Sequence, residues 1–218
     1  MGHHVHSPYT YALFTNVLFE RWQYYSFERI ENFRRKTSRI LQSCPSDQPK
    51  YAQLLQRLCA TNNAKTILQL GTGSGITAMY LASNDTKSTV YTCNGKKENS
   101  RDNASNFRLM KCDNIRVLAG GETHGSASLQ AVVGNLDFLF VRPSQGFHDI
   151  QQYYERFKLL RNETSIFVFD RIHSTPDLET QWNKIYKSPE VTLSLDLYEL
   201  GIVWFRSELK KQHYIVKY

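Results

Sequence analysis

The sequence predicts an α/β fold built on a doubly wound, mostly parallel sheet, and three observations support this prediction. From residue 61 onward, short β-rich runs alternate with segments of helical periodicity. Two runs, Phe138–Val141 and Ile166–Phe169, are apolar throughout, which is typical of parallel strands buried by helices on both faces. A turn with glycine at every second position from 71 to 75 joins one strand directly to a helix. In such folds ligands bind at the carboxyl ends of the strands, so these tips are the positions to inspect for function.

The N-terminal part, residues 1–60, is expected to form a helical extension of the α/β domain. Tyr11–Tyr25 carries apolar side chains at helical spacing, and Ser7 followed by Pro8 is typical of a helix start. Tyr51–Ala60 predicts another amphipathic helix. The sequence therefore predicts that helices precede the first strand of the sheet.

The α/β domain, residues 61–218, consists of alternating elements followed by a change of rhythm. The expected strands are Thr66–Leu70, Thr89–Thr92, Ile115–Leu118, Asp137–Val141 and Ser165–Asp170. The helices expected between them are Ile76–Ala82, Asn99–Leu109, Ser126–Val133 and Ile150–Leu160. One more helix and three closely spaced strands follow at Asp177–Tyr186, Val191–Leu197, Ile202–Phe205 and His213–Lys217. Because only a short turn separates the first two of these strands, they are expected to form an antiparallel hairpin.

Charge and composition restrict the classes to which the chain can belong. The 218 residues carry a formal net charge of +7, and 41% of them are hydrophobic. That hydrophobic fraction excludes a disordered chain, and no apolar run reaches the roughly 20 residues that a membrane span needs. Four cysteines without a paired motif indicate reduced thiols, so a cytoplasmic location without membrane contact is expected.

The densest basic run lies at residues 29–39, where three basic residues follow one another from Arg34. Its functional interpretation is a contact with RNA or phosphate. Its structural interpretation is the solvated face of a helix whose other side carries Ile30 and Phe33. We prefer the structural interpretation and keep nucleic acid as an alternative partner. A homodimer formed through the N-terminal helices is also left open.

The segment Ile67–Ala82 resembles the first motif of class I S-adenosylmethionine-dependent methyltransferases, and within them the O-methyltransferase-like branch. Its glycines follow the spacing G-x-G-x-G and not the dinucleotide spacing G-x-G-x-x-G. The late strand Phe167–Asp170 is similar to that of the same fold, and the opening His3–Pro8 resembles the start of a group of uncharacterised bacterial methyltransferase-like proteins. The resemblance implies a Rossmann-like methyltransferase fold with a seven-stranded sheet, a C-terminal antiparallel hairpin and S-adenosylmethionine as cofactor.

The resemblance also implies roles for individual residues. The glycine loop, which we define as Gly71–Gly75, would pass under the methionine part of the cofactor. The tips of the following strands would approach its ribose, its adenine and the methyl group that is transferred. The implied cofactor-binding residues are Gln69, Gly71, Thr72, Gly73, Ser74, Gly75, Asn94, Gly95, Gly120, Gly121 and Arg142.

Four positions depart from the pattern of the family. Acids are usual where this chain has Gln69 and Asn94, and oxygen ligands of a metal are usual where it has Arg142 and Arg171. A cofactor that carries a sulfonium and an ammonium favours acids in its pocket, and magnesium needs several oxygen ligands. The departures therefore predict no bound metal and argue against tight binding of the cofactor.

Three residues are candidates for catalysis. Asp170 ends the fifth strand, although pairing with an arginine is the preferred interpretation of this carboxylate. His148 and His173 are candidates for a general base, because imidazole exchanges protons near neutral pH. For each histidine, a structural or surface role is the competing interpretation.

Three functions follow from these patterns. The first is a metal-independent transfer of a methyl group from S-adenosylmethionine to a small molecule. The second is a pseudoenzyme of the same fold that serves as a binding or interaction module, and the lost acids favour it. The third is an RNA-directed methyltransferase, for which the basic run at residues 29–39 is the motivation.

Overall fold

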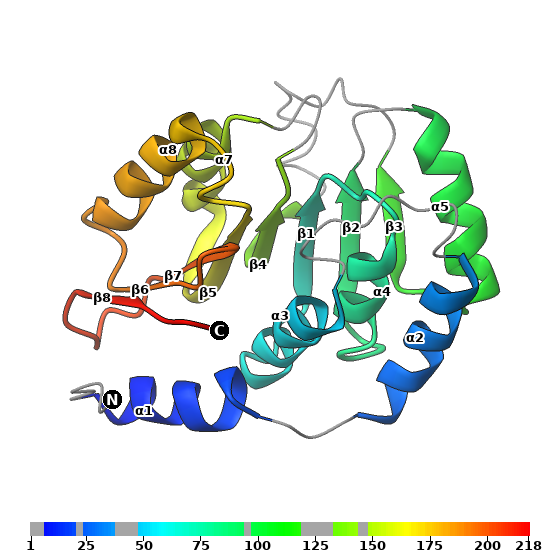
Figure 1. Ribbon diagram of the computed structural model, residues 1–218, viewed down its shortest axis with the longest axis horizontal. Coiled ribbons are helices and arrows are strands. Elements are labelled where there is room, and N and C mark those ends of the chain that lie inside the picture. Colours follow the sequence, from blue (N-terminus) through cyan, green and yellow to red (C-terminus); the bar gives the residue numbers. More distant parts are fainter. Residues whose placement is uncertain (1–6, 21–23, 38–47, 94–96, 119–132, 144–147) are drawn as a thin grey trace.

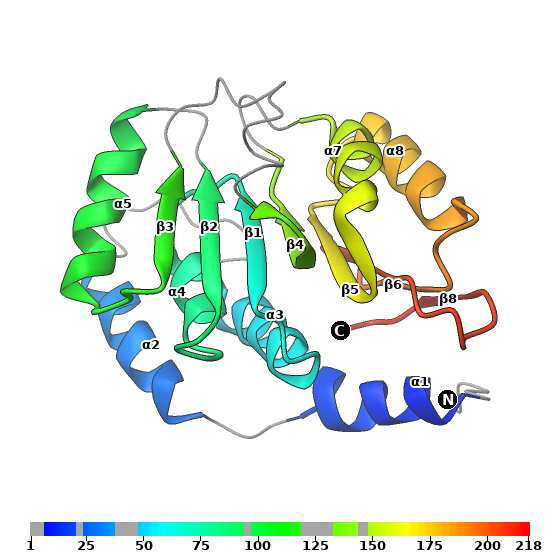
Figure 2. The same ribbon diagram turned by 180° about the vertical axis from the view of Figure 1, so that it is seen from behind.

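The computed structural model describes residues 7–20, 24–37, 48–93, 97–118, 133–143 and 148–218. These residues form one mixed sheet of eight strands with helices on both of its faces (Figures 1 and 2). The order across the sheet is β3-β2-β1-β4-β5-β7-β6-β8. The predicted doubly wound α/β class is confirmed.

The strands lie at or close to the predicted ranges. They are β1 Thr66–Leu70, β2 Thr89–Cys93, β3 Ile115–Leu118, β4 Leu136–Val141, β5 Arg161–Asp170, β6 Leu193–Asp196, β7 Leu200–Trp204 and β8 Gln212–Ile215. Strands β1 to β5 pair in parallel, so their carboxyl ends share one edge of the sheet, which is uppermost in Figure 1. Strand β7 pairs antiparallel with both β5 and β6, which confirms the predicted hairpin.

The sheet has eight strands, as many as the strand ranges predicted from the sequence pattern and one more than the seven that the resemblance implied. The additional strand, β8, pairs in parallel with β6 at the outer edge of the sheet. The Gln212 N–H donates to the Thr192 carbonyl and the Val216 N–H to the Asp196 carbonyl, each at 2.8 Å. Strand β8 thus covers backbone groups of β6 that an unpaired edge would leave exposed.

The helices include one correction to the predicted bounds. They are α1 Pro8–Leu13, the π-helical turn η1 Phe14–Leu18, α2 Tyr25–Thr37, α3 Pro49–Thr61, α4 Ile76–Ala82, α5 Lys97–Leu109, α7 Ile150–Phe157, the 3₁₀ turn η4 Lys158–Leu160 and α8 Pro176–Lys187. The predicted start of the first helix at Ser7 and Pro8 is confirmed, whereas its predicted end at Tyr25 is wrong, because Phe19 leaves the helical region at φ −100° and ψ 12°. The predicted Ser126–Val133 helix lies almost entirely outside the described residues.

Alternate side chains of the strands face two hydrophobic clusters. Ile67 belongs to the cluster that packs against α3 and α4, and its neighbour Leu68 belongs to the cluster that packs against α7 and α8. The N-terminal helices share the first cluster with the sheet, since Leu13, Phe27 and Leu54 are buried in it. Among the described helices, none combines the length and apolar content that crossing a membrane would require.

Candidate functional site

The glycine loop follows the tip of β1 and leads directly into α4. All three of its glycines adopt positive φ, with +82° at Gly71, +55° at Gly73 and +82° at Gly75. Residues with a side chain rarely adopt such angles, so the loop depends on glycine at each position. The Gly71 N–H donates to the Cys93 carbonyl at 2.9 Å and holds the loop against the end of β2.

Arg142, directly after β4, lies against the inner side of this loop. A Cβ atom built on Gly71 would lie 2.6 Å from the Arg142 carbonyl oxygen, and one built on Gly73 would overlap with Nη1 of the Arg142 guanidinium. The close approach that glycine permits at 73 is therefore made here by an internal side chain. The Arg142 N–H also donates to the Leu70 carbonyl at 2.8 Å, which joins the tips of β1 and β4.

The guanidinium of Arg142 is buried together with a carboxylate. Its Nη2 donates to Thr77 Oγ1 on α4 at 2.9 Å, and its Nε lies 3.4 Å from Asp170 Oδ2 at the end of β5. Arg142 is 2% exposed and Asp170 0%. Because a buried charge is tolerated only with a counter-charge, each of these side chains requires the other. This pairing is the interpretation that the sequence analysis preferred for Asp170.

Polar side chains on β1, β2 and α5 form hydrogen bonds with the glycine loop. Gln69 is fully buried, its Nε2 donates to the Gly71 carbonyl at 3.4 Å, and its Oε1 accepts no hydrogen bond from the described residues. The hydroxyls of Thr72 and Thr92 lie 2.7 Å apart. Asn103 on α5 donates to the Gly73 carbonyl at 3.1 Å. The loop is thus anchored to β2 and α5, and Gln69 contributes a buried acceptor beneath it.

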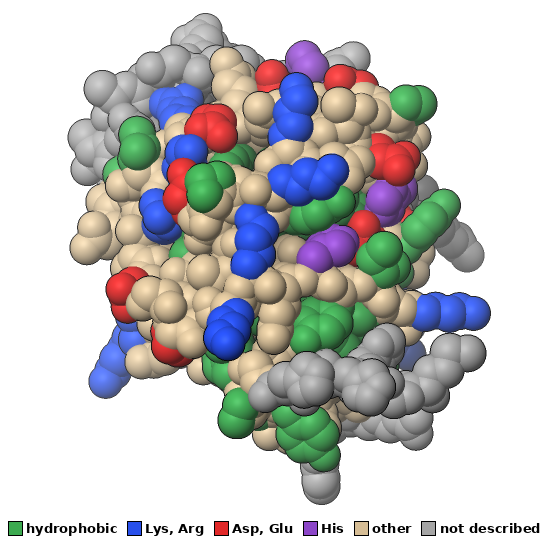
Figure 3. Space-filling model, turned by 90° about the vertical axis from the view of Figure 1, so that its left-hand side faces the viewer, with side chains coloured by type: hydrophobic (Ala, Val, Ile, Leu, Met, Phe, Trp, Pro, Cys, Tyr) green, Lys and Arg blue, Asp and Glu red, His purple; other side chains and the backbone are tan. Residues whose placement is uncertain are grey.

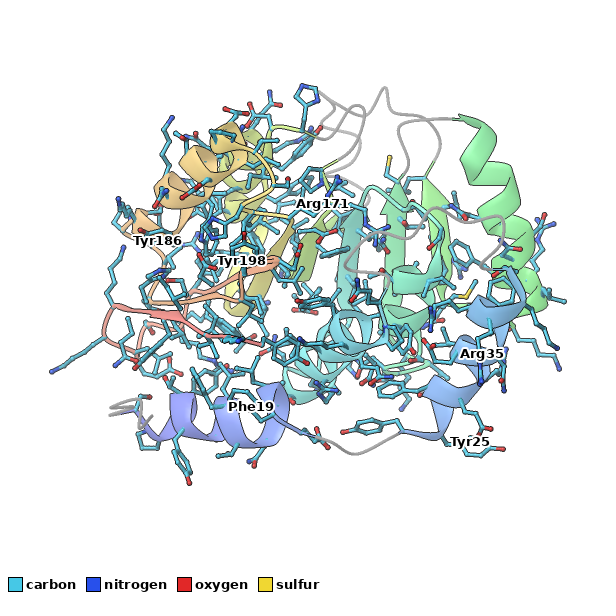
Figure 4. The ribbon with its side chains drawn as sticks, in the orientation of Figure 1. Phe19, Tyr25, Arg35, Arg171, Tyr186 and Tyr198 are labelled. Carbon is cyan, nitrogen blue, oxygen red and sulfur yellow. The ribbon has the colours of Figure 1, made fainter. Side chains whose placement is uncertain are left out.

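Arg171 follows β5 and adopts a positive φ of 56°, which is uncommon for a residue with a side chain. Its Nη2 donates to the Pro143 carbonyl, and its N–H donates to the Glu199 carbonyl at 2.6 Å. Figure 4 shows Arg171 at the same end of the sheet as the tip of β1. Two guanidinium groups, those of Arg142 and Arg171, therefore follow the adjacent strands β4 and β5.

His173 belongs to a separate group at the tip of β6, which we call the outer cluster: His173, Trp182, Asp196 and Tyr198. His173 Nε2 lies 2.8 Å from Asp196 Oδ2, and the imidazole stacks on the Tyr198 ring at 5.3 Å between centroids. Asp196 also accepts from Trp182 Nε1 at 3.0 Å and from the Tyr198 N–H at 2.9 Å. Within the described part of the chain, these contacts join His173 to α8 and the β6–β7 turn and not to the glycine loop.

The outer cluster lies on the side of the molecule formed by α8 and β8. Figure 3 views this side and shows histidine side chains next to exposed hydrophobic ones. The stacked pairs on this side are His173 with Tyr198 and His213 with Tyr186, the second at 4.0 Å between ring centroids. Lysine and arginine side chains follow one another down the middle of this face, with acidic side chains mostly to either side of them.

The remaining predicted site residues divide into two groups. His148 is exposed and stands next to Asp149, whose carboxylate caps α7 by accepting from the Gln152 N–H at 2.8 Å. Asn94, Gly95, Gly120 and Gly121 lie outside the described residues. The structure thus brings Gln69, Gly71 to Gly75, Arg142 and Asp170 together, and it places His173 in a different group.

The basic run on α2 is largely engaged in contacts within its own helix. Arg34 pairs with Glu31 at 2.6 Å, and Arg35 Nη2 donates to Asn32 Oδ1 at 2.8 Å. Ile30 and Phe33 are buried on the opposite side of the helix. The structural interpretation of this run is supported, whereas these contacts provide no specific support for RNA binding.

An S-adenosyl cofactor fits the backbone of the glycine loop better than it fits the side chains around it. The positive-φ glycines and the buried Gln69 Oε1, which could accept from a ligand ammonium, match such a group. The Arg142 guanidinium, however, lies against Gly73, where the methionine part is implied to pass. Of the described residues, no three His, Cys, Asp or Glu side chains lie close enough together to ligate a metal ion.

The residues that sequence reasoning missed include three that hold these groups together. Thr77 binds Arg142, Asn103 binds the glycine loop, and Asp196 binds His173. Thr77 lies in the first turn of the helix after the loop, so its position was a usable signal. Asn103 and Asp196 lie 30 and 23 residues from their partners, and no spacing rule connects them.

Comparison with known proteins reveals shared structure without close sequence similarity. No protein-family model matches the sequence, and no curated protein matches it. The SAH-bound Podospora anserina methyltransferase PaMTH1 has a TM-score of 0.64 at 14% identity, covering 95% of this chain and 100% of that chain. The Bacillus cereus O-methyltransferase in complex with SAH has a TM-score of 0.59 at 18% identity, covering 89% and 96%.

A third solved structure, the O-methyltransferase TomG from Streptomyces achromogenes in complex with SAM, has a TM-score of 0.60 at 14% identity, covering 91% of this chain and 95% of that chain. All three likenesses extend over almost the whole of each chain. The strand order, the glycine loop and these likenesses all indicate the same fold. The chain has the class I S-adenosylmethionine-dependent O-methyltransferase-like fold.

Proposed function

We propose that the protein is an S-adenosylmethionine-dependent methyltransferase that acts on a small molecule without a metal ion. The observation that carries this proposal is the glycine loop, whose three positive-φ glycines stand at the tip of β1 in a fold shared with SAH- and SAM-bound methyltransferases. When bound, the cofactor would supply a methyl group on a sulfonium. Gly71–Gly75 would hold its methionine end, and Gln69 Oε1 would accept from its ammonium.

The arrangement of charges supports independence from metal. Asp170 is the carboxylate at the tip of β5, and the guanidinium of Arg142 pairs with it at 3.4 Å. A hard divalent cation prefers several oxygen ligands, and a guanidinium in their place repels it. We therefore expect any methyl transfer to proceed at full rate in the presence of a chelator. Asp170 and His148 remain the candidates for proton transfer, since His173 contacts the outer cluster.

Calorimetric titration with SAM and SAH tests the proposal directly, together with a labelled-methyl assay against pooled small molecules. We expect binding that Gly71→Ala abolishes, because the added Cβ would meet the Arg142 backbone. Gly134→Ala is the matched control: Gly134 also has positive φ, at 61°, but an added Cβ there meets nothing within 4 Å. The absence of heat at millimolar ligand would contradict the proposal.

A pseudoenzyme of the same fold is the second candidate, and the buried Arg142–Asp170 pair favours it. A guanidinium inside the glycine loop opposes the entry of a cation, and His173 contacts the outer cluster instead of the loop. This candidate predicts protein that purifies without cofactor and transfers no labelled methyl group to any substrate. Detection of SAM or SAH in the purified protein by mass spectrometry would exclude it.

A further inference from the structure

We propose that Arg142 is an internal latch of the cofactor site: its guanidinium occupies the methionine end of the glycine loop, and it must leave before an S-adenosyl ligand can enter. This inference rests on the proposed function, because it concerns the regulation of the same site. It goes beyond that function by assigning to one side chain the control of access.

The first argument is spatial. A side-chain atom as small as Cβ on Gly73 would overlap with Nη1 of Arg142, so the guanidinium lies in van der Waals contact with the loop backbone. A ligand that used the same backbone would need that same space. Since packed interiors contain few voids, the two occupants exclude each other.

The second argument concerns charge. Asp170 is fully buried, and a carboxylate in that position needs a cation beside it. Arg142 supplies this cation when no ligand is bound. A cationic ligand that displaces the guanidinium brings its own positive charge to the same site, so the exchange replaces one cation with another.

The third argument is that release of the guanidinium does not require the backbone of Arg142 to move. Two of its anchors, Thr77 Oγ1 on α4 and Asp170 Oδ2 on β5, bind side-chain atoms. The backbone of Arg142 is held separately by the Leu70 carbonyl. Rotation about the side-chain bonds of Arg142 therefore breaks both anchors while β1 and β4 stay joined.

The latch lowers the apparent affinity, because only the released fraction of molecules can bind ligand. Replacement of Arg142 by methionine keeps most of the side-chain volume and removes the charge and both anchors. We expect Arg142→Met to tighten the binding of SAH by about tenfold or more, which corresponds to a released fraction of at most about a tenth in the parent. The gain should be larger for SAM, since its sulfonium is repelled by the guanidinium whereas the thioether of SAH is not.

The experiment is calorimetric titration of SAH and SAM into the full chain and its variants. Arg116→Met is the matched control, because Arg116 is a surface arginine whose Nη1 donates to the Asp113 carbonyl at 2.7 Å. We expect this control to bind both ligands as the parent does. If Arg142→Met does not fold, Arg142→Lys decides, because it keeps a cation near Asp170 but cannot form both anchors; a smaller gain in affinity is expected.

The possible outcomes separate the latch from the proposed function. Equal, measurable affinity in the parent and in the deciding variant would overturn the latch while leaving cofactor binding intact. No binding by either protein would overturn both. Tighter binding by the variant and not by Arg116→Met would support the latch, and the proposed function would then be judged by methyl transfer.

Discussion

Two carboxylates, at the ends of β5 and β6, are buried in different ways, and β7 separates their strands in the sheet. Asp170 ends β5, is 0% exposed, and faces a permanent cation, the guanidinium of Arg142. Asp196 ends β6 and is 4% exposed. Its carboxylate contacts the His173 imidazole and accepts hydrogen bonds from the Trp182 indole N–H and the Tyr198 backbone N–H. Asp170 is stabilised by pairing with a charge. Asp196 is stabilised by several hydrogen bonds, and His173 is the one donor among them that can titrate.

The difference matters for function because the two sites respond differently to a ligand or a proton. The Arg142 guanidinium can leave Asp170 only if another cation takes its place, so we expect a positively charged ligand to cause this change. At Asp196 the hydrogen bonds fix a turn of the backbone, and Tyr198 in that turn holds a positive φ of 70°. The tip of β5 therefore suits the exchange of one bound cation for another, whereas the hydrogen bonds at the tip of β6 hold the backbone turn in one conformation.

The largest effect is expected for Asp170→Asn. This change leaves the buried guanidinium of Arg142 without its carboxylate, which typically costs about 3–5 kcal/mol. Urea unfolding monitored by tryptophan fluorescence measures it. A loss no greater than that of Asp196→Asn would contradict the contrast drawn between the two carboxylates.

A smaller loss, of roughly 1–3 kcal/mol, is expected for Gly73→Ala, because the new Cβ must displace the Arg142 guanidinium and because φ is positive. Gly134→Ala isolates the backbone contribution, since its Cβ meets nothing. The difference in stability loss between Gly73→Ala and Gly134→Ala should be smaller when both are made in the Arg142→Met variant. Strict additivity of the Gly73 and Arg142 changes would show that the two residues are not in contact.

Asp196→Asn should cost about 1–2 kcal/mol, because one of its three donors then faces an amide NH₂ group instead of an acceptor. The hydrogen bond of His173 to a charged acceptor is lost as well. Thermal unfolding measures the change, with Asp177→Asn on the exposed start of α8 as the control. A neutral result would mean that water replaces the lost acceptor at this edge.

The smallest effect concerns His213, whose ring stacks on Tyr186 and whose Nδ1 lies 2.8 Å from Ser194 Oγ. Partial burial lowers the pKa of His213; Asp196 opposes this shift and Lys187 adds to it. The unfolded chain therefore binds this proton at a higher pH, so acidification below about pH 6.5 favours unfolding. His213→Gln should reduce the loss of thermal stability between about pH 7 and 5, where the histidine titrates. An unchanged pH profile would assign the sensitivity to other groups.

Much of the fold could be predicted from local patterns. The bounds of β1, β3 and α4 agree with the prediction, because each is set by a local change between apolar periodicity and turn residues. Strand β8 was predicted as well, at His213–Lys217, and lies at Gln212–Ile215. Its parallel pairing with β6, about 19 residues earlier, could not be predicted, because it depends on a distant edge strand and not on the composition of β8.

The candidate site was predictable in outline and not in its contacts. Glycines at 71, 73 and 75 correctly indicated a tight turn at a strand tip. The sequence could not reveal that Arg142 fills it, because the bond to Thr77 spans 65 positions. For the same reason His173, which was predicted on the border of the pocket, lies in the outer cluster, where Asp196 at 23 positions' distance holds it.

The contact between Arg142 and the backbone of Gly73 also ties the residue tolerated at one position to the residue at the other. With arginine at 142, a side chain at 73 must displace Nη1 of the guanidinium, whereas a short residue at 142 would leave that space open. Substitutions at the two positions are therefore expected to be coupled and not independent.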